Sequence, residues 1–232
     1  MNESLSSYRP VEALGVDARA AFITRTYWHL FGAIVGFTLL EVFFFKSGLA
    51  QPMAQLMLSG SWLIVLGAFM IVGWAASHVA GSARSLGAQY AALAGFVLAE
   101  SIIFVPLLFV AHYAIQGNVI QSAAVVTLLG FTGLTGTVLI TRKDFSFLRS
   151  VLVWVGIGAL LLIVASVLFG FQLGTLFSVG MIVFAGAAIL YDTSNVLHRY
   201  PEDRYVAAAL SLFASVALLF YYVLMIFAGG RR

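Results

Sequence analysis

Residues 205–228 read YVAAALSLFASVALLFYYVLMIFA, a run of 24 residues without a charged side chain. A membrane-spanning helix needs about 20 consecutive, mostly apolar residues. Further stretches of mostly apolar residues and sufficient length cover residues 22–45, 60–80, 86–111, 119–141, 147–170 and 174–197. The sequence therefore predicts an all-α, polytopic membrane protein, a bundle of seven transmembrane helices. We expect the last segment to cross the membrane fully; a re-entrant segment is the alternative, because a full crossing leaves Arg231 and Arg232 outside.

The composition of the whole chain agrees with this fold class. Hydrophobic residues make up 62% of the 232 residues and charged residues only 9%, whereas soluble domains carry about 25% charged residues. The absence of cysteine excludes disulfides, zinc–thiolate sites, iron–sulfur clusters and thiol catalysis. The basic residues are scattered, so we expect the lipid bilayer and not nucleic acid as a partner.

The first residues form a separate, short segment. Residues 1–21 lack the basic and apolar pattern of a secretory signal, and we interpret them as a cytoplasmic tail before one domain, residues 22–232. The end of this tail, from Val11 to Ala20, is either disordered or a weakly amphipathic interfacial helix. A cytoplasmic N-terminus obeys the positive-inside rule, because most of the 12 Lys and Arg residues then lie inside. The inside residues are Arg9, Arg19, Arg25, Arg84, Arg142, Lys143, Arg149, Arg199 and Arg204, and the outside ones are Lys46, Arg231 and Arg232.

Four ionisable residues lie unusually deep in the predicted spans. Asp192 is about six residues, or roughly 9 Å, inside the cytoplasmic end of its segment. Glu100 is close to the middle of segment 86–111. Arg25 and His29 are four residues apart on one face of segment 22–45, at a depth comparable to that of Asp192. Such residues usually pair, face the bundle interior or line an aqueous cavity.

The matched depths predict that Arg25 or His29 provides the counter-charge of Asp192. Such a pair is either a proton-sensitive gate or a static contact that fixes helix packing. No basic residue matches the depth of Glu100, which is therefore either protonated and hydrogen-bonded or exposed to a wet cavity that binds a proton or a cation. Glu41 is close to Lys46 at the outer end of its segment, and we interpret it as an interfacial acid.

Several kinds of catalytic site are absent from the sequence. The two lysines, Lys46 and Lys143, do not lie in the last segment, where a retinal protein needs its Schiff base. The last segment has no acid that could act with Asp192 as an intramembrane protease pair. Nucleophile elbows, zinc-protease motifs and phosphate loops do not occur. We expect no enzyme activity and no cofactor.

Three stretches carry a resemblance to a known family. They are TVLITRKDFSFLRSVL (137–152), AGAAILYDTSNVLHRYPEDRYVAAALSLFASVALLF (185–220) and, more loosely, ITRTYWHLFGAIVGFTLLE (23–41). They resemble the Bax inhibitor-1 family, and specifically its bacterial YccA-like branch, over essentially the whole chain. The resemblance implies a seven-helix fold with a central last helix and a location in the bacterial inner membrane.

Two functions are implied by this resemblance. Leak-type members are pH-sensitive calcium leaks, gated by two aspartates that share a proton. The first aspartate corresponds to Asp192, but the second corresponds to Ser215, so this chain lacks half of the pair. YccA-like members also carry serine there, and they associate with the membrane-anchored protease FtsH and its regulatory complex as substrate and modulator. The basic latch of leak-type members is also missing, because its region offers only His78.

We therefore expect a YccA-like protein that modulates membrane-protein quality control, in which residues 1–20 are the natural element for FtsH to engage. The alternative from another functional class is a pH-sensitive leak for calcium, protons or other cations that uses Asp192 and Glu100 and contributes to ion homeostasis. A third possibility is a scaffold whose buried charges only fix the packing.

Overall fold

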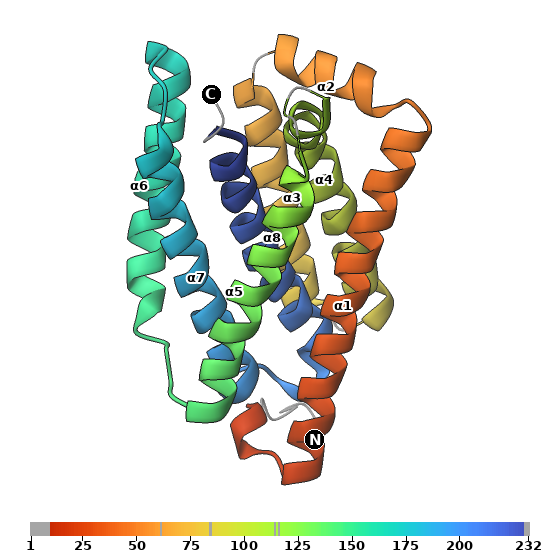
Figure 1. Ribbon diagram of the computed structural model, residues 1–232. Coiled ribbons are helices and arrows are strands. Elements are labelled where there is room, and N and C mark those ends of the chain that lie inside the picture. The colour runs from red at the N-terminus through yellow and green to blue at the C-terminus, as the bar shows by residue number, and fades with distance from the viewer. Residues whose placement is uncertain (1–9, 61, 84, 114, 116, 230–232) are drawn as a thin grey trace.

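The computed structural model describes residues 10–60, 62–83, 85–113, 115 and 117–229, which form a bundle of helices (Figure 1). In this part of the chain, seven helices are long and apolar enough to cross a membrane. They are α1 (Val16–Lys46), α3 (Trp62–Ser82), α4 (Leu86–Tyr113), α5 (Val119–Thr141), α6 (Leu148–Phe169), α7 (Thr175–His198) and α8 (Tyr205–Gly229). The predicted class is confirmed.

The observed bounds differ most from the predicted ones at the first span. The helix α1 begins at Val16, six residues before the predicted start at residue 22, and a short 3-10 helix, η1 (Val11–Ala13), precedes it. A second 3-10 helix, η2 (Glu202–Arg204), leads into α8. The predicted tail therefore contains regular structure from Val11 onward. Residues 1–9, and with them Arg9, lie outside the described residues, as do Arg84, Arg231 and Arg232.

The helix α2 (Ala50–Ser59) was not predicted, and it connects α1 to α3. Its 10 residues are too few to cross a bilayer. Ala50, Ala54 and Met57 are its buried residues, and their spacing of four and three places them on one face. This face packs mainly on α4, and α2 lies across the end of the bundle (Figure 1).

The helices α4 and α8 form the centre of the bundle. In the most apolar part of each of these two helices 56% of the residues are buried, compared with at most 22% in the other spans. The helix α8 packs against α7 most extensively and also contacts α1, α3, α4 and α5. Figure 1 shows α8 surrounded by these helices. The central last helix implied by the family resemblance is therefore present.

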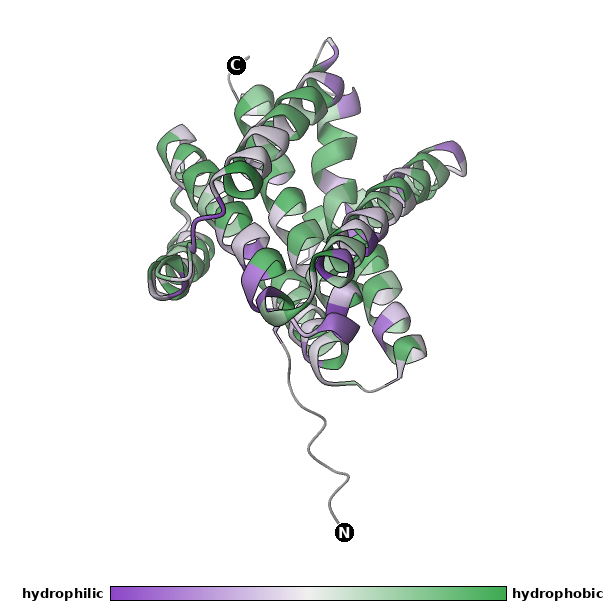
Figure 2. Cartoon of the chain, turned by 90° about the horizontal axis from the view of Figure 1, so that it is seen from below, coloured by the Kyte–Doolittle hydropathy of each residue, from purple (hydrophilic) through white to green (hydrophobic). Residues whose placement is uncertain are grey.

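The outer surface of the bundle is apolar. Large hydrophobic side chains such as Trp154 on α6 and Leu176 on α7 are exposed, and Figure 2 shows hydrophobic residues along the outward faces of the helices. Contact with lipid satisfies such residues, because hydrocarbon chains are as apolar as they are. The helix α6 is the most peripheral span, since only 6% of the residues in its most apolar part are buried. The chain is thus a multi-pass membrane protein.

The two ends of the described chain lie at opposite ends of the bundle. Figure 1 shows η1 at the lower end and the end of α8 at the upper end. The helix α8 is continuous over 25 residues, which gives a length of about 37 Å at 1.5 Å per residue. This length agrees with the predicted full crossing of the last segment.

Candidate functional site

The C-terminal part of α7 is enclosed by the other helices. Five consecutive residues, Thr193, Ser194, Asn195, Val196 and Leu197, are buried. Consecutive positions on a helix point about 100° apart, so a buried run of this length has neighbours on every side. The helix α7 contacts α8, α5, α6, α1 and η1. Polar groups in this region are therefore held in fixed surroundings.

Asp192 is hydrogen-bonded to Ser215, the residue for which the family resemblance implies an aspartate in leak-type members. The hydroxyl of Ser215 on α8 donates to the Oδ2 atom of Asp192 at 2.6 Å. Ser215 is buried and Asp192 is partly buried. A hydrogen bond this short to a carboxylate is of the stronger, charge-assisted kind. The position that the sequence marks as a missing acid is thus the partner of Asp192.

A second polar contact lies one turn away on the same face of α8. The hydroxyl groups of Tyr200 and Ser211 are 2.9 Å apart, and Ser211 precedes Ser215 by four residues. Tyr200 follows the end of α7. Burial, and then the charge of Asp192, raise the pKa of the Tyr200 phenol above its ordinary value of 10.0. These two contacts join the end of α7 to α8.

The predicted ion pair between Asp192 and α1 is not formed. Among the described residues, no basic group lies within ion-pair distance of Asp192. The guanidinium of Arg25 lies over the ring of Tyr205 at 5.7 Å. The Nε2 atom of His29 is 2.9 Å from the hydroxyl of Tyr90. Arg25 and His29 thus lie at the junction of α1, α4 and α8. The sequence indicates how deep a residue lies along its helix, but it does not indicate the side of the helix from which the side chain projects.

The ring of His29 has a defined tautomer when it is neutral. Its Nδ1 atom is 2.6 Å from the carbonyl oxygen of Arg25, and a carbonyl only accepts hydrogen bonds. The Nδ1 atom must therefore carry the hydrogen, and the Nε2 atom accepts from the hydroxyl of Tyr90. This arrangement fixes α1 to α4.

Three hydroxyl groups around Thr193, the residue that follows Asp192, have no hydrogen-bond partner within the described part of the chain. They belong to Tyr27 on α1, Thr135 on α5 and Thr193 on α7. The hydroxyl of Tyr27 faces the other two. Buried polar groups of this kind are commonly satisfied by an ordered water molecule. The interior around Thr193 is thus polar on three helices.

Glu100 lies in a different part of the bundle. It is 6% exposed and lines a cavity of about 560 Å³ to which α3, α4, α6, α7 and α8 contribute. Asp192 does not line this cavity. No described residue forms a hydrogen bond or an ion pair with Glu100. Of the two predicted environments, exposure to a cavity agrees with this geometry.

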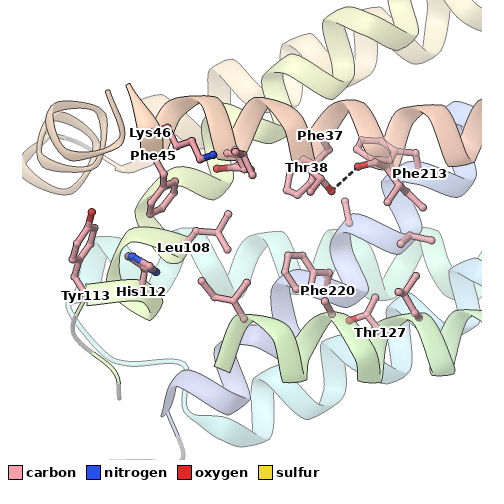
Figure 3. Close-up of a pocket in the computed structure, with 18 residues that line it drawn as sticks. Phe37, Thr38, Phe45, Lys46, Leu108, His112, Tyr113, Thr127, Phe213 and Phe220 are labelled. Carbon is pink, nitrogen blue, oxygen red and sulfur yellow. Dashed lines mark hydrogen bonds between the residues drawn. The ribbon is translucent and has the colours of Figure 1, made fainter. Parts of the chain in front are cut away.

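Glu41 is more deeply buried than an interfacial acid. Its residue is 7% exposed, and neither carboxylate oxygen has a hydrogen-bond partner in the described part of the chain. It lines a cavity of about 650 Å³ between α1, α4, α5 and α8 (Figure 3). The prediction that Glu41 is an interfacial acid was therefore wrong. Glu41 forms no ion pair with Lys46 among the described residues, and it is buried where it lines the cavity.

The loop between α5 and α6 is tied to α7 through Asp144. Its Oδ1 atom accepts the backbone N–H of Ser146 at 2.8 Å and the hydroxyl of Ser194 at 3.3 Å. Its Oδ2 atom is 3.2 Å from a guanidinium nitrogen of Arg199. The hydroxyl oxygen of Ser194 also accepts the backbone N–H of Phe145 at 2.9 Å. The N–H of Ser146, followed by Arg199, holds the pKa of Asp144 below its ordinary value of 3.8.

This lowered pKa predicts a pH dependence of stability. Because the folded carboxyl has the lower pKa, its contribution is present above pH 3.8 and is lost as the pH falls through the folded value. Asp144→Asn should reduce the stability by less than about 1 kcal/mol at neutral pH, since the side chain is half exposed. The thermal unfolding temperatures of variant and wild type should therefore converge once the pH has fallen below the lowered pKa of the folded carboxyl.

Asp17→Asn is the matched control for this prediction, because Asp17 forms no ion pair with the described residues. Asp17→Asn leaves the contacts of Asp144 intact. A difference for Asp144→Asn that stays constant with pH would contradict the assigned role of the carboxylate.

The segment before α1 is attached to the end of α7. The backbone N–H of Val11 donates to the carbonyl of Tyr200 at 2.9 Å, and the side chain of Val11 is fully buried. The Nδ1 atom of His198 is 3.2 Å from the Oε2 atom of Glu12. We call these two contacts the N-terminal clasp. The sequence pattern predicted a tail here and gave no sign of the clasp.

The acidic and histidine side chains of the described residues do not gather into a metal site. No set of three or more His, Cys, Asp or Glu side chains there is arranged to hold a metal ion. The acids Asp192, Glu100 and Glu41 each stand apart from the others. Their surroundings differ in kind: Asp192 has a hydroxyl partner, whereas Glu100 and Glu41 face cavities.

Comparison with known proteins identifies the family to which this chain belongs. The family model described as "Inhibitor of apoptosis-promoting Bax1" matches residues 19–232. The chain belongs to the Bax inhibitor-1 family.

Individual relatives match parts of this Bax inhibitor-1 chain. An uncharacterized protein of Pseudomonas aeruginosa is 42% identical over 119 residues, 49% of this chain and 52% of the relative. The "Modulator of FtsH protease YccA" of Escherichia coli K12 is 35% identical over 120 residues, 50% of this chain and 53% of the relative. The "Golgi anti-apoptotic protein" of vaccinia virus strain Lister is 30% identical over 140 residues, 58% of this chain and 55% of the relative. The chain thus spans about half the length of these curated relatives.

Proposed function

We propose that this Bax inhibitor-1 protein modulates membrane-protein quality control by binding an FtsH-type protease, with its N-terminus in the cytoplasm of a bacterial cell. The similarity to a protein named as an FtsH modulator supports the proposal. A second relative is named as an inner membrane protein. The function requires protein contacts outside the bilayer and no catalytic group.

The N-terminal clasp is the observation that carries this proposal. It holds the segment that follows residue 9 against the connection between α7 and α8. The loop with Asp144 is tied to the same end of α7. A polar surface outside the bilayer is thus built around the N-terminal segment, and a cytoplasmic protease domain would meet this surface first.

The deletion of residues 2–9 tests the proposal. We expect the shortened protein to lose most of its co-purification with FtsH while it keeps its thermal unfolding temperature, because the deletion ends before the clasp. A longer deletion of residues 1–20 would also remove Val11, which is fully buried, and would confuse lost binding with lost stability.

The matched control replaces residues 2–9 by a Gly-Ser segment of equal length. It should behave like the deletion if the side chains of this segment are recognised, and like the wild type if only its length matters. Either result supports engagement of the N-terminal segment. Undiminished co-purification after the deletion would contradict it.

A cation leak is the second candidate function. The observation in its favour is the set of unpartnered hydroxyls of Tyr27, Thr135 and Thr193, the last of which follows Asp192 in the sequence. Oxygen atoms are the ligands that calcium prefers. Calcium flux into liposomes, with a pH dependence abolished by Asp192→Asn, would support a leak and refute a pure binding function. The same experiment with Glu100→Gln tests whether the cavity at Glu100 belongs to the route.

A further inference from the structure

The cavity that contains Glu41 has the size and shape of a small-molecule site. Its volume is about 650 Å³, within the range of about 300–1,000 Å³ that is usual for ligand pockets. Figure 3 shows Lys46, His112 and Tyr113 toward one end, and Phe37, Phe213 and Thr127 toward the other. The aromatic residues of the lining are Phe37, Phe45, Tyr113, Phe213 and Phe220.

Two polar groups in this cavity have no partner. Both carboxylate oxygens of Glu41 and the hydroxyl oxygen of Thr127 are buried without a hydrogen bond in the described part of the chain. Both residues are more than nine-tenths buried and line the cavity. A carboxylate in such surroundings is costly unless an opposite charge or a hydrogen-bond donor meets it. The cavity therefore lacks a positively charged or donating partner for Glu41.

The nearby basic side chains do not provide that partner. Lys46 lies on the same helix and lines the cavity, but it forms no ion pair with Glu41 within the described residues. His112 of α4 also lines the cavity, and its ring contacts Phe45 and Tyr113. Both residues lie toward one end of the cavity in Figure 3, and Thr127, Phe37 and Phe213 lie toward the other.

The lining also defines the chemistry of a suitable ligand. Calcium takes about six to eight oxygen ligands, whereas this cavity offers one carboxylate and two threonine hydroxyls in an otherwise mostly apolar wall. An anion would be repelled by the negative charge of Glu41. Aromatic rings, in contrast, attract organic cations through their faces and also accommodate an apolar body.

We propose that the cavity between α1, α4, α5 and α8 binds an organic cation, with Glu41 as its counter-charge and the aromatic rings around its apolar body. The site is separate from Asp192 and from the N-terminal clasp. It does not depend on the proposed contact with FtsH.

Binding of tritiated tetraphenylphosphonium to the purified protein in lipid nanodiscs tests this proposal. Its charge is permanent, so that its own protonation does not complicate the result. We expect saturable binding to the wild type, above that of empty nanodiscs, and a loss of affinity of about tenfold or more in Glu41→Gln. Glu41→Gln should fold, because it replaces an unpartnered charge by a neutral group of the same shape.

Three further variants sharpen the test. Glu100→Gln changes a buried acid in the other cavity and should bind like the wild type. Ala124→Phe fills the cavity and should weaken binding without a change of charge. Lys46→Gln removes a positive charge that repels the cation, and this variant should bind at least as tightly as the wild type. Equal affinity of Glu41→Gln and wild type, an equal loss in Glu100→Gln, or absence of saturable binding would overturn the proposal.

Discussion

Phe104→Ala should destabilise the protein by about 3 kcal/mol, the lower end of the range for phenylalanine deletions in packed cores. Phe104 is almost completely buried at the centre of the bundle. Its ring contacts those of Phe37 on α1 and of Phe220 and Tyr221 on α8. In a membrane the loss is mainly one of van der Waals packing, because lipid solvates an apolar side chain as well as the protein does.

The measurement is an unfolding titration with dodecyl sulfate in mixed micelles. Phe31→Ala is the matched control, because Phe31 lies on α1 and is largely exposed; its variant should unfold close to the wild-type midpoint. Similar midpoints for Phe104→Ala and Phe31→Ala would show that the contact between α1, α4 and α8 is not the core of the fold.

Ser215→Ala should destabilise the protein by about 1–3 kcal/mol, because Asp192 then loses the donor of its 2.6 Å hydrogen bond. Asp192→Asn should show a loss of similar size. The double variant should be less destabilised than the sum of the two losses by about 1 kcal/mol, since the shared contact can be lost only once. Dodecyl sulfate unfolding of the four proteins gives this coupling energy.

Ser101→Ala is the control for the serine substitution. Ser101 is also buried, but its hydroxyl donates only to the carbonyl of Val97 in its own helix. Its removal should therefore change the free energy of unfolding by a few tenths of a kcal/mol. A coupling energy near zero between Asp192 and Ser215 would mean that the observed hydrogen bond does not join α7 to α8 energetically.

The seven spans could be predicted because their apolar runs exceed the thickness of a bilayer. The helix α2 was missed because its buried face, with Ala50, Ala54 and Met57, is short and built from small or flexible side chains. The early start of α1 was missed because residues 16–21 are more polar than the span. Length and hydropathy identify what lies in the membrane and say little about the connections.

The candidate site was predictable only in part. The depth of Asp192 in its span could be estimated from the sequence, but its partner could not. Arg25 and His29 match its depth and point elsewhere, whereas Ser215 had been noted only as an absence. Glu41 was misjudged for a similar reason, because the nearness of Lys46 in the sequence does not show which way either side chain turns. The direction of a side chain around its helix requires the packed structure.

The N-terminal clasp also determines how the protein responds to mechanical load. Tension applied to the chain before Pro10 reaches the hydrogen bond from Val11 to Tyr200 and the pair of Glu12 and His198 before it reaches α1. Tyr200 is joined in turn to Ser211 of α8. A motor that pulls on the N-terminus must therefore rupture the clasp before it can draw out the first span alone; with the clasp intact, the load is shared by α1, α7 and α8.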